Sequence, residues 1–129
     1  MPLELDLHWE EAVMVVRCRG RIQAGTGCER LLETVRPEIH ITPDAVLNLS
    51  QVQAMDSAGI GALVRLYVEA HVAGGRMRLS NVPPQIRGLL KVAMLTSVIQ
   101  IHPTEEAAVA ASARRPGTHR ARGKNKTQA

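Results

Sequence analysis

The spacing of apolar residues switches repeatedly along this chain between the period of a strand and that of a helix, and this alternation constrains the fold most. Residues 3–8 alternate leucine with polar residues, and a valine-rich run at 12–19 follows after two glutamates, so the pair predicts a β-hairpin. Residues 45–50, AVLNLS, are too few for a helix and are typical of a buried strand. Further strands are predicted at 76–82 and 97–102.

Three segments carry apolar residues at helical spacing instead. They are residues 28–36, which Pro37 is expected to end, 60–73 and 83–95. A fourth helix is predicted at 105–112, because Thr104 offers a cap and two glutamates an acidic first turn. The helix at 60–73 has the clearest pattern. Its expected buried face consists of Ile60, Leu63, Val64, Tyr67 and Val68.

The resulting order, β-β-α-β-α-β-α-β-α, predicts an α/β (α+β) fold with a mixed sheet and helices packed against it. A chain of 129 residues is the size of one domain, which we assign to residues 1–112. Residues 113–129 hold six basic residues and no acid, and they are predicted to form a disordered basic tail. With one Trp, one Tyr and no Phe, the chain offers almost no surface on which bases could stack, so no specific nucleic-acid site is expected.

Composition also argues against metal and membrane sites. The two cysteines, Cys18 and Cys28, lack the spacing of a metal or redox motif, and the five histidines are scattered, so neither a metal nor a cofactor is predicted. The chain has no apolar run long enough to span a bilayer, and acids occupy the region where a signal peptide needs basic residues. We therefore expect a cytoplasmic protein without membrane contact.

The stretch MDSAGIG, residues 55–61, joins the buried strand at 45–50 to the helix at 60–73. It fails the spacing of three catalytic or nucleotide motifs. A nucleophile elbow needs glycine where Met55 stands, a dinucleotide fingerprint needs glycine where Val64 stands, and no Gly-Lys-Ser or Gly-Lys-Thr occurs anywhere in the chain. The sequence therefore predicts no enzyme.

Two interpretations of this stretch remain open. In one, Asp56 or Ser57 simply caps the helix. That leaves Gly59 and Gly61 unexplained, since each costs roughly 1 kcal/mol relative to alanine in a helix. In the other, the bare backbone lets another surface approach closely, and a phosphoryl group on Ser57 would add about 1.5 to 2 negative charges at the docking point.

The segments LNLS, MDSAGIGALV, AGGRMRLSNV and IRGLLKVAML, in this order and spacing, resemble a STAS domain of the bacterial anti-sigma factor antagonist family over residues 3–112. The resemblance implies a protein-binding regulator with no chemistry of its own. It implies that an anti-sigma factor with serine kinase activity phosphorylates Ser57 and that a serine phosphatase reverses this. The unphosphorylated antagonist would sequester the anti-sigma factor. The residues expected to contact this partner are Asp56, Ser57, Gly59, Ile60 and Gly61.

One departure from the family pattern concerns residues 20–23. Many phosphorylated members have Gly-Glu-Leu-Asp there, whereas this chain has Gly-Arg-Ile-Gln and so resembles a GRI-type branch, with Gln23 in place of an acid. The alternative function is therefore a non-phosphorylated STAS scaffold or accessory subunit of a signalling or lipid-transport complex, in which Ser57 only caps the helix. Homodimer formation is compatible with either function.

Overall fold

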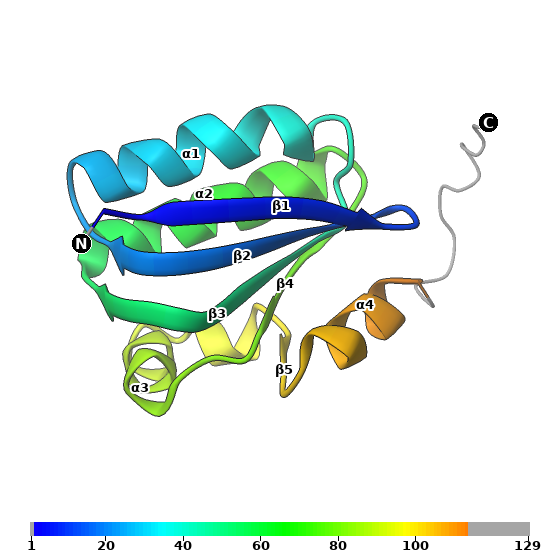
Figure 1. Ribbon diagram of the computed structural model, residues 1–129. Helices are drawn as coiled ribbons and strands as arrows, with labels where there is room; N and C mark the ends of the chain where they lie inside the picture. The colour runs from blue at the N-terminus through cyan, green and yellow to red at the C-terminus, as the bar shows by residue number, and fades with distance from the viewer. Residues whose placement is uncertain (1, 114–129) are drawn as a thin grey trace.

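A computed structural model describes residues 2–113, in which five strands form one mixed sheet (Figure 1). The strands are β1 (Glu4–Glu10), β2 (Val13–Ile22), β3 (Ala45–Met55), β4 (Met77–Ser80) and β5 (Ile101–His102). They lie side by side in chain order, with β1 antiparallel to β2 and every later strand parallel to the one before it. The predicted α/β class and the opening hairpin are confirmed. Residues 114–129, most of the expected basic tail, lie outside the described residues.

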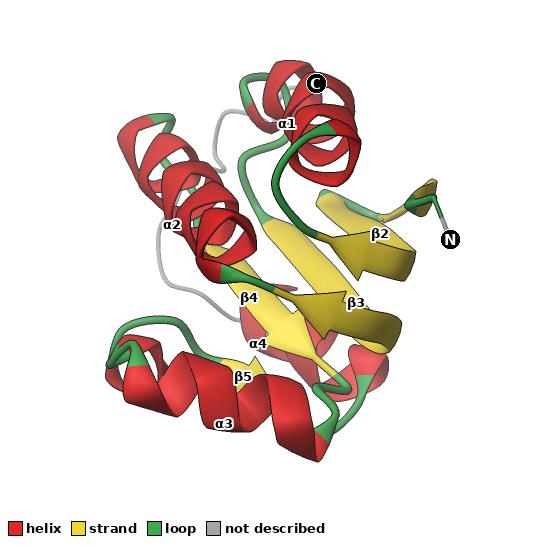
Figure 2. Cartoon of the chain, turned by 90° about the vertical axis from the view of Figure 1, so that its left-hand side faces the viewer, coloured by secondary structure: helices red, strands yellow, loops and turns green. Residues whose placement is uncertain are grey.

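The helices cover both faces of the sheet, but unequally (Figure 2). They are α1 (Thr26–Ile39), α2 (Ser57–Val72), α3 (Pro84–Val92) and α4 (Glu105–Ala113), with a short 3-10 helix at Leu95–Ser97. Helices α1, α2 and α3 bury their apolar side chains in the main core, which we call the inner face. On the opposite, outer face, Ala108 of α4 packs in a small cluster with Val13 and Val46.

Pro37 does not end α1, contrary to the prediction. The helix continues to Ile39, whose side chain is fully buried. Proline removes one backbone donor, but in the last turn that loss is small enough for the burial of a large apolar side chain to offset it.

The region predicted as a last strand at 97–102 is also different. Helix α3 ends at Val92, Met94 adopts a left-handed backbone with φ of 66°, and the 3-10 helix follows. Only Ile101 and His102 pair with β4, which itself has just four residues. The 3-10 helix at Leu95–Ser97 occupies the start of the predicted strand, so only its last two residues are left to pair with β4.

The sequence of β4 alternates Met77 and Leu79 with the polar Arg78 and Ser80, which is typical of a strand with one exposed face, yet all four residues are buried. Arg78 is only 3% exposed. Its Nε donates to Gln100 Oε1 at 2.8 Å and its Nη1 donates to Ser112 Oγ at 3.1 Å. Alternate residues of β4 therefore lie on opposite faces of the sheet, but neither face is exposed. Helix α4 covers the side of the strand on which Arg78 lies.

Candidate functional site

The start of α2 lies at the end of the sheet toward which the arrows of β2 and β3 point (Figure 1). In sheets of parallel strands this is the edge where ligands and partners meet the loops. Asp56 has an extended backbone and forms the N-cap of α2. Its Oδ1 accepts from the backbone N–H of Gly59 at 2.9 Å, and its Oδ2 accepts from the N–H of Ala24 at 3.0 Å. One carboxylate thus caps α2 and ties it to the loop before α1.

These backbone contacts also fix the charge state of Asp56. The hydrogen bonds from the N–H groups of Ala24 and then Gly59 lower the pKa of the carboxyl below its ordinary value. Hydrogen bonding to the charged form of an acid favours that form. Asp56 is therefore an anion at neutral pH, beside the first helical residue, Ser57.

Ser57 is exposed, and among the described residues its hydroxyl has no hydrogen-bond partner. Because the side chain of Asp56 already supplies the cap, the hydroxyl of Ser57 is not needed for this purpose. The two interpretations that the sequence left open thus fall on different residues. The cap is Asp56, and the adjacent hydroxyl is available to a partner.

The two glycines of this stretch have different surroundings. Gly59 is buried, and a Cβ there would overlap the backbone carbonyl of Ile22 and the side chain of Met55. Gly59 thus lets the start of α2 lie directly against the end of β2 in the same chain. Gly61 is exposed, and a Cβ there would meet nothing within 4 Å. The fold explains Gly59 but not Gly61.

The buried face of α2 differs from the predicted one. Among the predicted residues only Leu63 is fully buried, Ile60, Val64 and Tyr67 are half-buried, and Val68 is 50% exposed. The residues that face the core are Gly59, Ala62, Leu63, Leu66 and Ala70. Small residues occupy the inner side because α2 lies close to the sheet, so the larger Val68 lies outside.

The loop between β2 and α1 completes the site. The resemblance drew attention to Gln23 at its start, but the sequence did not predict the contact that Ala24 makes. Ala24 donates to Asp56, and its neighbour Gln23 is half-buried with its carbonyl accepting from Cys28 N at 3.0 Å. Gly27 resembles Gly59, since a Cβ there would overlap the carbonyl of Arg21. The signal for this contact was the pair of glycines that flank Thr26 after a strand, which allows a helix start to lie against a strand end.

The site contains no activated nucleophile or metal cluster among residues 2–113. Burial raises the pKa of the Cys18 thiol to about 12. Burial, and then the charges of Asp56 and Glu29, raise the pKa of Cys28. Both thiols stay protonated and unreactive. No three His, Cys, Asp or Glu side chains are grouped so that they could hold a metal ion. Within the same residues, no helix has the length and apolar content needed to cross a membrane.

The comparisons with known proteins agree with this architecture. The chain is 26% identical over 106 residues to the anti-sigma F factor antagonist of Paenibacillus polymyxa, an alignment covering 81% of this chain and 91% of the relative. Its fold is similar to that of a candidate anti-sigma factor antagonist from Thermotoga maritima, with a TM-score of 0.79, 18% identity, and coverage of 85% and 95% of the two chains.

A second structural relative has been solved in two modification states. The unphosphorylated form of SpoIIAA matches with a TM-score of 0.69 at 20% identity, covering 87% of this chain and all of the other. The phosphorylated form of the Bacillus protein matches with a TM-score of 0.63 at 21% identity, covering 83% and 97%. At these identities the structural matches establish the fold. The model of the STAS domain matches residues 4–108, so the chain belongs to the STAS domain family.

Proposed function

We propose that this protein is an anti-sigma factor antagonist whose binding to its partner is switched off by phosphorylation of Ser57. The observation that carries the proposal is that the two neighbouring residues at the start of α2 have different roles. Asp56 makes both structural hydrogen bonds, and the next residue presents a hydroxyl that is exposed and has no bond to the described part of the domain. Such a group can be modified without disturbing the fold.

Two opposing electrostatic effects would act on a phosphate group on Ser57. The partial positive charge of the α2 N-terminus favours an anion, by roughly 0.3 to 1 kcal/mol at exposed positions. The ionised Asp56 disfavours it, because like charges repel. With these effects opposed, the domain stays folded and its outer surface gains about 1.5 to 2 negative charges. The switch then acts on binding and leaves the fold intact.

The proposed partner surface begins at Asp56 and Ser57 and continues along α2 through Ile60 and Gly61. Gly61 supports this assignment because it is exposed and, like any glycine within a helix, it destabilises the helix relative to alanine. No described neighbour lies close enough to exclude a side chain at this position. Gly59 contributes by holding the helix start against β2, so its part in binding is indirect.

Helix α3 lies at the same end of the molecule as the start of α2 and extends this surface (Figure 2). Leu89 is 39% exposed, Val92 85% and Met94 73%. Gly88 in the same helix has nothing within 4 Å of the position of a Cβ, as at Gly61. Exposed apolar side chains beside bare backbone are typical of a surface that a protein partner covers.

The partner we propose is an anti-sigma factor with serine kinase activity, and a serine phosphatase would restore the free hydroxyl. The relatives named as anti-sigma factor antagonists support this choice. Gln23 departs from the family acid next to the contact between Ala24 and Asp56. A neutral amide there lowers the negative charge near Ser57, so a kinase would meet Asp56 but not the second acid of the family pattern.

The test starts by purifying the binding partner of the full chain from native lysate and identifying it by mass spectrometry. Its affinity is then measured by calorimetry for the wild type, Ser57→Ala and Ser57→Asp. We expect Ser57→Ala to bind like the wild type. Ser57→Asp should bind far more weakly, because like charge at an interface costs several kcal/mol. Incubation with the partner and ATP should add one phosphate to Ser57.

Thr104→Asp is the matched control, because Thr104 is exposed and caps α4, so this change also adds an acid at the start of a helix. It should leave partner affinity unchanged. Equal affinity of Ser57→Asp and wild type, with no phosphate on Ser57, would refute the switch. That result would favour the scaffold or accessory-subunit function, which the missing acid at Gln23 also fits.

A further inference from the structure

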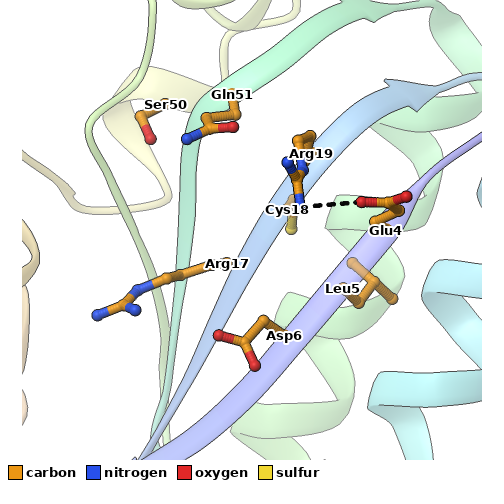
Figure 3. Close-up of a pocket in the computed structure, with 8 residues that line it drawn as sticks. All are labelled: Glu4, Leu5, Asp6, Arg17, Cys18, Arg19, Ser50 and Gln51. Atoms are coloured by element: carbon orange, nitrogen blue, oxygen red, sulfur yellow. Dashed lines mark ion pairs between the residues drawn. The ribbon is translucent and has the colours of Figure 1, made fainter. Parts of the chain in front are cut away.

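A polar cavity of about 320 Å³ opens on the outer face of the sheet, away from the start of α2 (Figure 3). Three neighbouring strands contribute its polar side chains. These are Glu4 and Asp6 from β1, Arg17 and Arg19 from β2, and Ser50 and Gln51 from β3. The proposed function makes no use of this cavity.

A bulge in β3 builds one wall of the cavity. Arg17 pairs with Asn48 and Arg19 with Gln51, so a single residue of β2 lies opposite two residues of β3. The bulge breaks the alternation of the strand, and Ser50 and Gln51 are consecutive yet both exposed. Asn48 Oδ1 stabilises the bulge by accepting from Ser50 N at 2.9 Å. Bulges commonly re-aim side chains in this way at binding sites.

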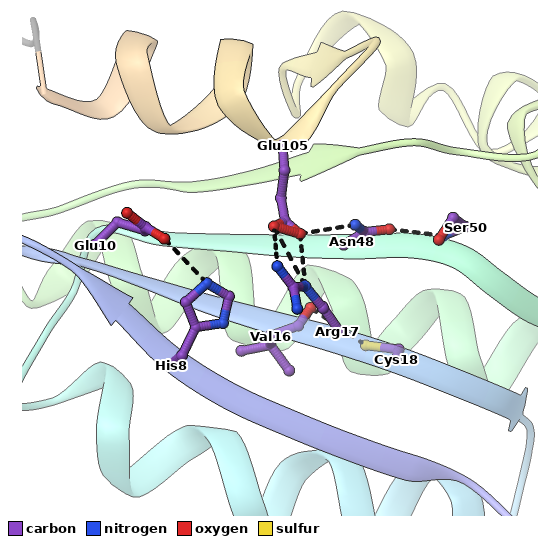
Figure 4. Close-up of polar contacts among 8 residues, drawn as sticks. All are labelled: His8, Glu10, Val16, Arg17, Cys18, Asn48, Ser50 and Glu105. Carbon is purple, nitrogen blue, oxygen red and sulfur yellow. Dashed lines mark hydrogen bonds and ion pairs between the residues drawn. The ribbon is translucent and has the colours of Figure 1, made fainter.

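Each of the two arginines already forms an ion pair within the domain, Arg17 with Glu105 (Figure 4) and Arg19 with Glu4 (Figure 3). The carboxylate of Glu105 in α4 accepts from Arg17 Nε at 2.8 Å and from Arg17 Nη2 at 3.0 Å, and it also accepts from Asn48 Nδ2 at 2.9 Å. On the next pair of strands, Arg19 Nη2 lies 2.9 Å from Glu4 Oε1. Orientation fixed in advance lowers the entropy that binding must overcome.

The polar groups of the cavity that have no hydrogen bond within the described residues indicate which kind of ligand it can bind. Arg17 Nη1, Arg19 Nε and Nη1, the Ser50 hydroxyl and the Gln51 amide have no hydrogen bond to another described residue, and together they form a set of donors. The Asp6 carboxylate likewise has no hydrogen-bond partner within residues 2–113, although it lies across the strand pair from Arg17. The cavity thus offers donors for an anion beside an acceptor for a cation.

We propose that this cavity binds a small zwitterion of the α-amino acid type. The carboxylate of the ligand would accept from Arg19, Ser50 and Gln51, and its ammonium group would donate to Asp6, while Arg17, which extends toward Glu105, forms the wall beside them (Figure 3). A simple anion would meet the charges of Asp6 and Glu4, and a simple cation would leave the donors without an acceptor. The volume of about 320 Å³ is at the lower end of ligand pockets, which suits a molecule of this size.

The experiment is a titration of the full chain, labelled with nitrogen-15, followed through its amide resonances. L-Glutamine is the probe, since its side chain carries no charge. N-acetyl-L-glutamine lacks the ammonium group, and L-glutaminamide lacks the carboxylate. We expect saturable shifts for residues of the cavity with a Kd on the order of 1 mM, and binding at least about tenfold weaker for each analogue.

Two variants and one control sharpen the test. Asp6→Asn should weaken L-glutamine about tenfold and remove the discrimination against N-acetyl-L-glutamine, while Arg19→Gln should weaken both. The control is Gln53→Ala, because Gln53 is exposed on β3, the strand of Ser50 and Gln51, but lies outside the cavity; this change should leave L-glutamine binding unaltered. The proposal is overturned by absence of saturable shifts up to about 50 mM. It is equally overturned if either analogue binds as tightly as L-glutamine, or if Asp6→Asn still discriminates against N-acetyl-L-glutamine as the wild type does.

Discussion

The two faces of the sheet are held together by different interactions. The inner face buries large side chains from the sheet and from three helices, among them Leu31, Leu47, Leu66 and Leu79, all fully shielded from solvent. The outer face has a small apolar cluster around Val46. There, polar contacts between Arg17 and Glu105 and between Arg78 and Ser112 hold α4 in place. The difference teaches that burial sets the stability of the inner face, whereas α4 depends in part on the ion pair of Glu105, a group that responds to pH.

The largest predicted effect tests the inner face. Leu66→Ala should lower the free energy of unfolding by about 3 to 4 kcal/mol, because it removes a fully buried side chain and leaves a cavity. Val46→Ala on the outer face removes fewer buried atoms and should lower the free energy of unfolding by about 2 kcal/mol. Urea denaturation followed by circular dichroism measures both. Equal losses at the two sites would contradict the distinction between the faces.

The next effect concerns the backbone contact that seals the inner face at the start of α2. Gly59→Ala should destabilise the domain by roughly 2 kcal/mol, since the added methyl group meets the carbonyl of Ile22. Gly61→Ala, two residues along the same helix, should stabilise it by about 0.5 to 1 kcal/mol. Thermal unfolding of the two variants should therefore shift in opposite directions. A shift of the same sign would show that the two glycines are equivalent.

A smaller effect distinguishes the outer face by its dependence on pH. The hydrogen bond from Arg17 lowers the pKa of Glu105 from its ordinary 4.5. A carboxyl whose pKa is lower in the folded state adds stability above its unfolded value, and this contribution is lost as the pH falls through the folded value. Glu105→Gln should thus cost about 1 kcal/mol at pH 7.

The measurement for Glu105→Gln is urea denaturation of wild type and variant at a series of pH values. The difference between them should shrink below about pH 4.5 and vanish in stronger acid. Glu106→Gln is the control because Glu106 is the exposed neighbour in the same first turn. It should give a pH profile that matches the wild type. A Glu105 difference that is constant with pH would show that the contact is not electrostatic.

The smallest effect is predicted at Ser57, which supports neither face. Because Asp56 supplies the cap, Ser57→Ala should change the free energy of unfolding by less than about 0.5 kcal/mol. Asp56→Ala removes two hydrogen bonds to backbone groups and should destabilise the domain more. Thermal unfolding of both variants provides the comparison. A larger loss for Ser57→Ala would give that hydroxyl a structural role.

Periodicity predicted most elements of the fold but not which side of α2 is buried. The helix is apolar on several sides, so spacing identified it correctly and placed Val68 inside, although Val68 is half exposed. The inner side contains Gly59 and Ala62, and small residues carry little weight in a hydrophobic pattern. Their position depends on the distance between helix and sheet, which only the assembled fold defines.

The sequence located the candidate site, but it did not predict the contacts that hold the site together. The stretch containing Asp56 and Ser57 could be placed between a buried strand and a helix because both have clear local patterns. The bond from Ala24 to Asp56 joins residues 32 positions apart, and no local pattern encodes it. The bulge at Ser50 was missed for a similar reason, because a bulge is a property of two paired strands.

The order of the strands in the sheet matches their order in the chain, and this has a consequence for how the protein is made. Each strand after the first finds its partner already synthesised, since one α-helix separates every parallel pair, with the short 3-10 helix added between β4 and β5. Contacts of this kind span short stretches of chain, and such topologies fold faster than those with distant pairings. The domain can therefore assemble progressively from its N-terminus during translation, and α4 is the last element to join.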